Sequence, residues 1–224
     1  CEEFLGAPED QYCTIFASNT TEALNIFARQ LQKEPALKNG SVVINTLLEH
    51  NSNELPWRYI PGLRSIRLNV DDEGFISLED LEATLKEYNH DGAHGTIRVS
   101  WVTISGASNV LASFNDLAAI SEIAHQYGAL LLVDAAQLVA HRKVDLAGSG
   151  IDAFVFSGHK VYAPFGSGGL IFRRDALHFF PGEFNAICSS GEENVSGIAA
   201  LAKIFSLLSH IAMEHLEKEE RDLT

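Results

Sequence analysis

A lysine lies at a position suited to covalent chemistry. Lys160 comes shortly after the apolar run Ala153–Phe156, with the segment Ser157–His159 between them. At the end of a buried strand we expect the amine to lose part of its hydration, and such an amine is a nucleophile that can form a Schiff base with a carbonyl compound. Gly166 and Gly168 follow the lysine rather than precede it, so the spacing does not match a nucleotide P-loop.

A carboxylate lies at an equivalent position in another segment. Asp134 ends the apolar run Leu130–Val133. A carboxylate that is buried without a partner is costly. We therefore expect Asp134 to face a ligand cation, a metal ion or a hydrogen-bond donor of the protein. The alternative is that its side chain caps the turn that follows.

Two hydroxyl side chains open a predicted helix after the first strand. Thr20 and Thr21 follow Asn19, which has the spacing from Glu22 that is typical of a capping box. The N–H groups at the start of a helix bind anions, and the two hydroxyl groups add donors. The segment therefore has the chemistry of an anion site, and the alternative is an ordinary helix cap.

Histidines occur in two predicted loops. His50 comes shortly after the apolar run Val42–Thr46. Its imidazole can stack on the ring of a ligand or transfer protons, and the alternative is a loop histidine that only faces solvent. His90, Asp91 and His94 lie in a glycine-containing loop. There we favour a solvated loop over a metal site, and we predict no metal ligands.

These side chains need a fold that brings strand ends together. Seven runs have the length and the apolar character of strands: Cys13–Ala17, Val42–Thr46, Ser65–Leu68, Ile97–Val102, Leu130–Asp134, Ala153–Ser157 and Gly169–Phe172. Helical patterns lie between them: after Asn19, from an N-cap at Ser77 to Tyr88, from Leu117 to a C-cap at Gly128, and from Ile198 to Leu216. This alternation predicts an α/β fold with three layers, α/β/α, around a mostly parallel sheet of about seven strands. Ligands of such sheets bind at the carboxyl ends of the strands.

The composition limits the class of protein. The 224 residues include 16 Lys+Arg and 30 Asp+Glu, a net charge of −14 that argues against a nucleic-acid partner. Hydrophobic residues make up 46%, as in a globular chain of one domain or slightly more. No apolar run approaches the roughly 20 residues of a membrane span. Because Cys1, Cys13 and Cys188 have no CxxC spacing, we expect a reducing, cytoplasmic location.

Taken together and in this order, the strand ends resemble the class V aminotransferase family of fold-type-I enzymes, which use pyridoxal 5'-phosphate (PLP). The branch they resemble most is that of the cysteine desulfurases and selenocysteine lyases. The matching segments are Ser18–Ala23, Glu49-His50, Asp134–Gln137 and Phe156–Tyr162, with weaker matches at Leu55–Trp57 and Gly191–Asn194. The resemblance extends from about Cys13 to about Phe205.

The resemblance implies a role for each matched side chain, with Lys160, Asp134 and His50 as the catalytic set. Lys160 would hold PLP through a Schiff base and then move the proton at Cα of the substrate. Asp134 would pair with the pyridine nitrogen and favour its protonated form, on which the electron sink depends. Gln137 would hydrogen-bond the phenolic oxygen, and His50 would stack on the ring. The phosphate would be held by Thr20, Thr21, Ser157 and His159.

Two positions depart from the family pattern. The desulfurases commonly have an Asn near the end of the fourth strand that helps bind the substrate carboxylate, and we expect Trp101 in its place, with simple packing as the alternative. In the late Gly-x-x-Asn motif, Glu192 replaces a Thr that in relatives often reaches the phosphate of the partner subunit. We expect that contact to be lost or remodelled, because a carboxylate repels a phosphate.

The family members are also considerably longer. We therefore expect residues 1–224 to form one PLP-binding large domain, without the N-terminal segment and the C-terminal small domain. That small domain normally carries an Arg for the substrate carboxylate and, in desulfurases, the catalytic Cys, which none of the three cysteines matches. The resemblance also implies a homodimer, because the sites of this family lie at the subunit interface.

The sequence thus predicts a PLP-dependent enzyme that acts on the α-amino group of an amino acid through Lys160, by transamination or by β-elimination of sulfur or selenium. The alternative is a catalytically inactive fold-type-I domain with a structural or regulatory role, which Trp101, Glu192 and the short length favour. A nucleotide-dependent α/β enzyme is disfavoured, because neither GxGxxG nor Walker spacing follows the first strand.

Overall fold

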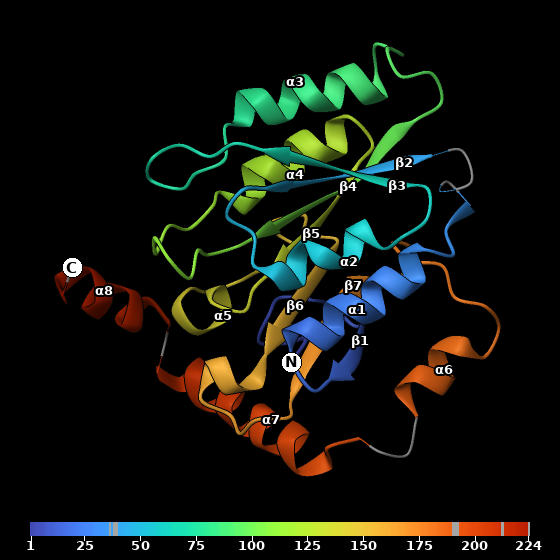
Figure 1. Cartoon of the computed structure of the whole chain (residues 1–224). Coiled ribbons are helices and arrows are strands. Elements are labelled where there is room, and N and C mark those ends of the chain that lie inside the picture. The colour runs from blue at the N-terminus through green and yellow to red at the C-terminus, as the bar shows by residue number, and fades with distance from the viewer. Residues whose placement is uncertain (36, 38–39, 190–192, 212, 224) are drawn as a thin grey trace.

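The computed structural model describes residues 1–35, 37, 40–189, 193–211 and 213–223, and its centre is one seven-stranded sheet (Figure 1). In chain order the strands are β1 (Tyr12–Ala17), β2 (Ser41–Thr46), β3 (Leu63–Leu68), β4 (Arg98–Ser105), β5 (Leu130–Asp134), β6 (Ala153–Ser157) and β7 (Gly168–Arg173). Their order across the sheet is β1-β7-β6-β5-β4-β2-β3. β7 is antiparallel to β1 and β6, and the other neighbouring strands are parallel. All seven predicted strands are present.

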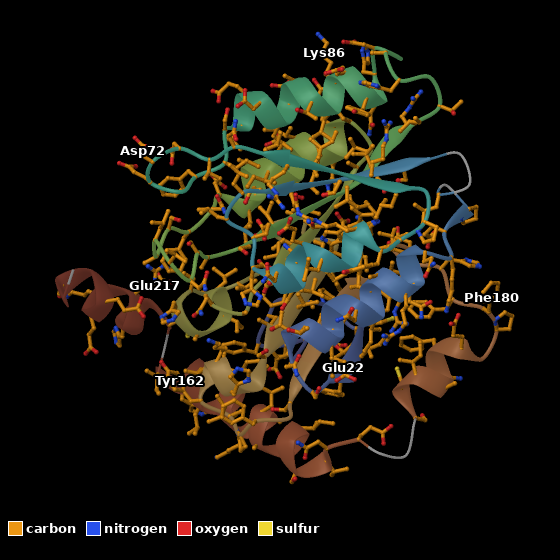
Figure 2. All side chains as sticks on the ribbon, in the orientation of Figure 1. Glu22, Asp72, Lys86, Tyr162, Phe180 and Glu217 are labelled. Atoms are coloured by element: carbon orange, nitrogen blue, oxygen red, sulfur yellow. The ribbon has the colours of Figure 1, made fainter. Side chains whose placement is uncertain are left out.

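Helices cover both faces of the sheet, so the predicted three-layer α/β/α fold is confirmed (Figure 1). One layer contains α3 (Leu78–Asn89), α4 (Leu117–Gln126), α5 (Leu138–His141) and α7 (Val195–Ile211). The other layer contains α1 (Thr20–Leu31), α2 (Leu55–Arg58) and α6 (Glu183–Cys188). The remaining helical elements are η2 (Asn51–Asn53), η3 (Gly158–Val161) and α8 (Met213–Leu223). Side chains fill the space between the sheet and both layers (Figure 2).

The central strands are apolar on both faces because each face packs against a helical layer. In β5, Leu131 and Val133 belong to the buried cluster of α3, α4 and α7, and Leu132 belongs to the cluster of α1 and α2. Successive side chains of a strand point to opposite faces. Asp134, two residues after Leu132, therefore points to the α1 side of the sheet.

The helix ends agree with the local sequence signals. The side chain of Asn19 caps α1 by accepting a hydrogen bond from Glu22 N at 3.0 Å. Ser77 caps α3 in the same way through Asp80 N, at 3.1 Å. Gly128 follows α4 with a φ of 73°, the left-handed conformation that glycine adopts readily. The predicted helix from Ile198 to Leu216 corresponds to α7 and α8, on either side of residue 212.

The expectation that Trp101 replaces a polar residue at the end of the fourth strand is wrong. β4 continues to Ser105, so Trp101 lies inside the strand. Its side chain is 2% exposed, and its ring meets that of Phe27 edge to face, with centroids 4.7 Å apart. The alternative, that Trp101 packs in the core between sheet and α1, is correct. The residues beyond the end of β4 are Gly106 and those that follow it.

The sequence predicted neither metal ligands nor a membrane-spanning segment, and the described part of the chain can be searched for both. Within it, no group of three or more His, Cys, Asp or Glu side chains could hold a metal ion. His90 instead contacts Asp91 at 2.9 Å, and the ring of His94 stacks on that of Tyr88. None of the helices formed by the described residues combines the length and the apolar character that a membrane crossing requires.

Candidate active site

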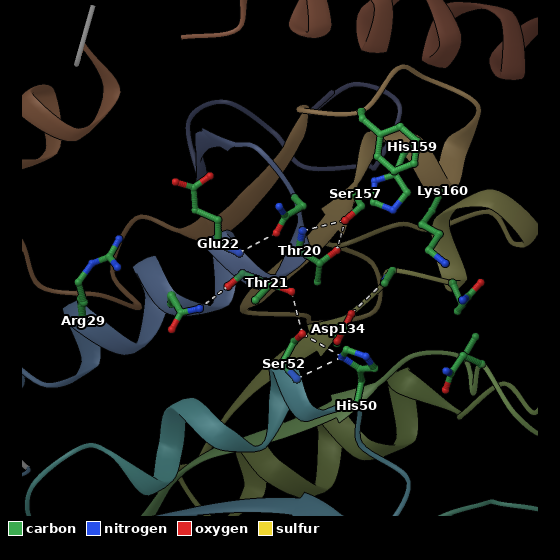
Figure 3. Close-up of a pocket in the computed structure, with 17 residues that line it drawn as sticks. Thr20, Thr21, Glu22, Arg29, His50, Ser52, Asp134, Ser157, His159 and Lys160 are labelled. Carbon is green, nitrogen blue, oxygen red and sulfur yellow. Dashed lines mark hydrogen bonds between the residues drawn. The ribbon is translucent and has the colours of Figure 1, made fainter. Parts of the chain in front are cut away.

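One pocket of about 880 Å³ opens at the carboxyl ends of the parallel strands (Figure 3). It is lined by side chains that follow β1, β2, β4, β5 and β6. All eight residues predicted to hold the cofactor line it: Thr20, Thr21, His50, Asp134, Gln137, Ser157, His159 and Lys160. The structure therefore brings together a set that spans 141 positions of the chain, Thr20 to Lys160 inclusive.

At one end of the pocket, the start of α1 contacts the end of β6. Ser157 Oγ lies 2.7 Å from both Thr20 N and Thr20 Oγ1. Both side chains are buried, at 5% and 3% exposure. Thr21 N has no hydrogen-bond acceptor among the described residues, so it remains a donor at the positive end of the α1 dipole. This corner is a preformed set of donors for an anion.

A glycine makes this contact possible. Gly168 pairs with Ala17 of β1 on one side and with Ser157 of β6 on the other. A Cβ atom on Gly168 would lie 2.5 Å from Phe156 O and 3.0 Å from Asn19 Cα. The absence of a side chain therefore lets the start of α1 approach the end of β6.

In the loop after β2, His50 is held by a short chain of hydrogen bonds. His50 Nδ1 accepts from Ser52 N at 3.2 Å and lies 2.9 Å from Ser52 Oγ. Ser52 Oγ is in turn 2.7 Å from Thr21 Oγ1. The chain connects the loop after β2 to the first turn of α1, and it is drawn with dashed lines in Figure 3.

Asp134 lies at the base of the pocket and is 4% exposed. Its Oδ1 accepts a hydrogen bond from Ala136 N at 3.0 Å, so it does cap the turn that follows, as the alternative reading had it. Burial raises the pKa of Asp134 to about 6, although the Ala136 N–H and the nearby His50 oppose this rise. The carboxylate is thus largely ionised at neutral pH, and among the described residues its hydrogen-bond donor is the backbone N–H of Ala136.

Lys160 and His159 come from η3, the single turn after β6. The Lys160 side chain is exposed, so our expectation that burial would remove its water is wrong for this chain. The ring of His159 stacks on that of Phe165, with centroids 4.6 Å apart. Burial and the neighbouring Lys160 lower the pKa of His159. Its Nδ1 is buried and has no hydrogen-bond partner among the described residues.

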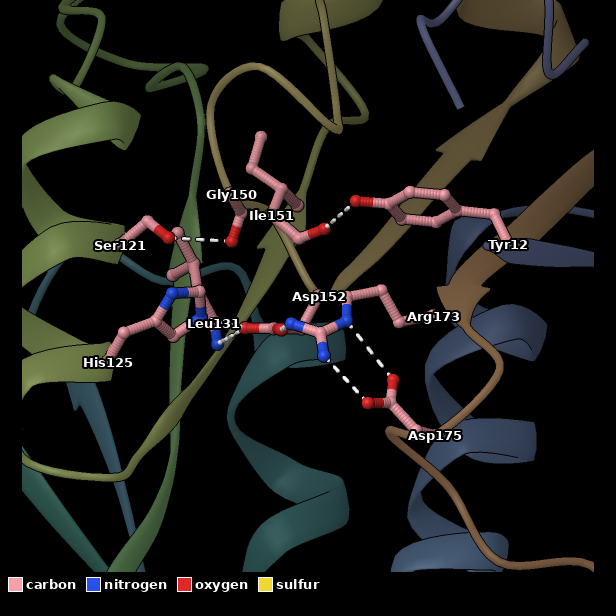
Figure 4. A network of polar contacts seen from close by, with 9 residues as sticks. All are labelled: Tyr12, Ser121, His125, Leu131, Gly150, Ile151, Asp152, Arg173 and Asp175. Carbon is pink, nitrogen blue, oxygen red and sulfur yellow. Dashed lines mark hydrogen bonds and ion pairs between the residues drawn. The ribbon is translucent and has the colours of Figure 1, made fainter. Parts of the chain in front are cut away.

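The other end of β6 is anchored in the core by Asp152, which is 0% exposed (Figure 4). Its Oδ2 accepts from Leu131 N at 2.8 Å and lies 2.7 Å from His125 Nε2. Its Oδ1 accepts from Arg173 of β7 at 2.9 Å. This network ties β5, β6, β7 and α4 together. It thereby fixes the strand whose opposite end carries Ser157 and leads to Lys160.

A sequence model of the family described as aminotransferase class-V matches residues 1–224. The chain belongs to this family. It is 32% identical to a probable cysteine desulfurase of Borreliella burgdorferi over 235 aligned positions, covering 93% of this chain and 53% of the relative. A cysteine desulfurase of Enterobacter sp. is also 32% identical, with 93% and 54% covered.

Solved structures of desulfurases have the same fold. The apo structure of a cysteine desulfurase from Thermococcus onnurineus superimposes with a TM-score of 0.82 at 27% identity, over 99% of this chain and 57% of that chain. A NifS-like protein superimposes with a TM-score of 0.78 at 25% identity. The chain thus spans about half the length of the relatives that it matches.

Among the residues that line the pocket of this class-V aminotransferase chain, sequence reasoning missed Asn109 and Arg29. Asn109 lies four residues beyond Ser105, the true end of β4. Had the strand been followed to that end, Asn109 would have been the first amide side chain after it. Arg29 lies on α1, two turns after Thr21, and only helical periodicity places it near the pocket.

Sequence reasoning also assigned no role to Glu49, the residue before His50. Its carboxylate accepts hydrogen bonds from Thr46 Oγ1 at 2.9 Å, Asn53 Nδ2 at 2.6 Å and Ser105 Oγ at 2.8 Å. Desolvation raises the pKa of Glu49 to about 7, against the effect of these donors. Glu49 therefore ties the end of β2 to η2 and to the end of β4.

The departure at Glu192 lies outside the described residues. The last residue of the same motif, Asn194, is described. Its Nδ2 donates to Gly166 O at 2.8 Å, and its Oδ1 accepts from Gly197 N at 3.0 Å. Asn194 therefore connects the start of α7 to the loop that follows Lys160.

Proposed function

We propose that this chain binds PLP in the pocket and acts on the α-amino group of an amino acid. The observation that carries the proposal is the set of Asp134, Lys160 and the Thr20–Ser157 corner around one pocket at the carboxyl ends of the strands. A carboxylate, an exposed amine and an anion-binding corner are the three kinds of group that a phosphorylated pyridine aldehyde requires.

The described residues fit such a group. The corner of Thr20, Thr21 and Ser157 offers hydroxyl groups and a free backbone N–H to a phosphate dianion. The buried, unpaired Nδ1 of His159 adds one further polar atom that lacks a partner. At the other end, the buried carboxylate of Asp134 forms no ion pair with any described residue. A net charge of −14 does not prevent anion binding, because local donors set the affinity.

PLP supplies an electron sink that stabilises negative charge at Cα of a bound amino acid. Asp134 would hold the proton on the pyridine nitrogen, which keeps that sink effective. Gln137 would hydrogen-bond the phenolic oxygen, and His50 would stack on the ring. Lys160 would hold the cofactor covalently and, once displaced by the substrate amine, would take the proton from Cα and return it.

The relatives named cysteine desulfurases make cysteine the first substrate to test for this chain. Two outcomes follow the loss of the Cα proton: transfer of the amino group, or elimination of sulfur or selenium at Cβ. We further propose that residues 1–224 form the cofactor-binding large domain of a cytoplasmic, homodimeric enzyme. The domain and the dimer are proposed from the family resemblance, and the location from the cysteine pattern.

The competing candidate is an inactive fold-type-I domain with a structural or regulatory role. One of its supports was Trp101, which packs against Phe27 in the core and so says nothing against a substrate pocket. Turnover distinguishes the two candidates. The full-length gene product, loaded with PLP, is incubated with a panel of amino acids that includes cysteine and selenocysteine. We expect release of sulfide, selenide or an oxo acid, and loss of release in Lys160→Ala. No turnover of any substrate in the panel would favour the inactive domain.

A further inference from the structure

Ser52 makes hydrogen bonds that no cofactor contact explains. It belongs to η2, after β2, yet its hydroxyl oxygen lies 2.7 Å from Thr21 Oγ1 in α1 and 2.9 Å from His50 Nδ1. Figure 3 shows the three side chains in a row along one wall of the pocket. Ser52 therefore joins the corner that is suited to an anion to the ring that faces Asp134.

The backbone defines the protonation of the His50 ring. Ser52 N–H can only donate, and it points to His50 Nδ1 at 3.2 Å, so Nδ1 accepts. A neutral imidazole has one donor and one acceptor nitrogen. The proton of neutral His50 consequently lies on Nε2.

The direction of the remaining bonds follows. Because Nδ1 has no proton, a hydrogen bond across the 2.9 Å contact has the Ser52 hydroxyl as its donor, and the hydroxyl shares the Nδ1 lone pair with Ser52 N–H. That uses the single proton of Ser52 Oγ, so in the 2.7 Å contact Thr21 is the donor and Ser52 the acceptor. The order is Thr21 to Ser52 to His50, and hydrogen bonds in such a chain polarise one another.

An anion at the start of α1 would change this order. An acceptor that takes the Thr21 proton withdraws it from Ser52 Oγ, which weakens the bond that Ser52 donates to His50 Nδ1. The ring nearest to Asp134 would thereby respond to an anion that it does not touch. His50 and Asp134 lie side by side in Figure 3.

We propose that Ser52 is a positioning residue that fixes the neutral His50 ring with its proton on Nε2 and couples it to anion binding at Thr21. The proposal rests on the proposed function, in which the anion is the cofactor phosphate and His50 stacks on the cofactor ring. Its tests use only the chain and inorganic phosphate, so they can fail separately from cofactor binding.

The first test is the tautomer of His50. Nitrogen-15 NMR of the imidazole above pH 8 distinguishes a proton on Nε2 from one on Nδ1. We expect the Nε2–H form in the wild-type chain. A ring with its proton on Nδ1 would overturn the proposal, and this measurement needs no variant that has to fold.

The second test is the coupling. Inorganic phosphate is titrated into the chain while the Thr21 amide and the His50 ring nitrogens are followed. We expect both to shift in the wild type, and the His50 shift to fall at least fivefold in Ser52→Ala while the Thr21 amide still responds. Ser52→Thr keeps a hydroxyl and should restore the His50 shift. Ser149→Ala, a serine remote from the pocket, should behave as the wild type.

Two results would contradict the coupling: a His50 shift in Ser52→Ala equal to that of the wild type, or a wild-type chain in which phosphate moves neither Thr21 nor His50. A chain that shows the phosphate coupling but gives no visible absorbance band with PLP would retain the role of Ser52 and reject the proposed cofactor.

Discussion

Thr20 and Ser157 are 137 residues apart in the sequence, and their hydroxyl oxygens lie 2.7 Å apart. The contact joins the first residue of α1 to the last residue of β6. Because Lys160 follows β6 by one turn, the same contact places the backbone of Lys160 near the anion corner. The pocket is therefore built before any ligand arrives.

Gly168→Ala should disturb the contact between Thr20 and Ser157 more than the addition of a methyl group anywhere else in the sheet. The new Cβ would lie 2.5 Å from Phe156 O and 3.0 Å from Asn19 Cα, and both are backbone atoms that cannot rotate away. We expect the free energy of unfolding to fall by about 1–3 kcal/mol, measured by urea denaturation. Affinity for PLP should fall as well. A variant with wild-type stability and affinity would show that α1 and β6 do not need this close approach.

Asp134→Asn should change stability with pH. Burial raises the pKa of Asp134 from 3.8 to about 6. Between these values the folded chain keeps a proton that the unfolded chain has lost, so ionisation at higher pH destabilises the folded state. A shift of that size corresponds to about 3 kcal/mol at most. The amide keeps an oxygen for Ala136 N and removes the charge.

The apo variant Asp134→Asn is therefore expected to be more stable than the wild type at pH 8, and this advantage should disappear by pH 4. Urea denaturation at several pH values measures it. Asp72→Asn, on a peripheral loop that is labelled in Figure 2, is the control and should show no comparable advantage. An Asp134→Asn variant that is equally stable at every pH would contradict the burial argument. The Asp134→Asn variant, although more stable at pH 8, should also lose the visible absorbance band with PLP.

Asp152→Ala should be among the most destabilising changes in the chain. It removes the acceptor for the buried Leu131 N and one of the two carboxylates that bind Arg173, whose side chain is 37% exposed and keeps Asp175. A buried donor left unsatisfied costs about 1–3 kcal/mol, and the lost bond to a charged group adds to this. Thermal unfolding would measure the loss. Asp175→Ala removes only an exposed partner of Arg173 and should cost less than about 1 kcal/mol; equal losses would remove the special role of Asp152.

Ala112→Gly should stabilise the protein. Ala112 has a φ of 56°, in the left-handed region that costs a non-glycine residue about 1–2 kcal/mol. Glycine removes that strain and adds unfolded-state entropy, so a net gain of about 0.5–1 kcal/mol is expected. Ala199→Gly in α7 is the matched control and should lose about 1 kcal/mol. The same sign for both variants would contradict the strain at Ala112.

The sheet could be predicted from sequence because its inner strands are almost continuous apolar runs. Leu130–Val133 and Ala153–Phe156 are such runs, and the residue that follows each, Asp134 or Ser157, lines the pocket. The end of β4 was placed too early. Thr103 and Ser105 interrupt the apolar pattern. Thr103 is nevertheless 0% exposed, and its hydroxyl donates a hydrogen bond to Ile44 O of the neighbouring strand β2.

Contacts between distant segments could not be predicted from the pattern. Neither the bond between Ser52 and Thr21 nor the exposure of Lys160 has a local signal. The first depends on how η2 packs against α1, and the second on how η3 packs against β6, α5 and α7. Glu49 was overlooked for the same reason. Its three donors come from β2, η2 and β4, which only the folded sheet brings together.

The central claim is that Lys160 binds PLP covalently. The wild-type chain and Lys160→Ala are incubated with PLP, reduced with borohydride, digested and analysed by mass spectrometry. We expect a visible absorbance band before reduction and one pyridoxyl group on the peptide that contains Lys160, both absent in the variant. A wild-type chain with no band and no adduct at Lys160, or with adducts only at other lysines, would contradict the claim.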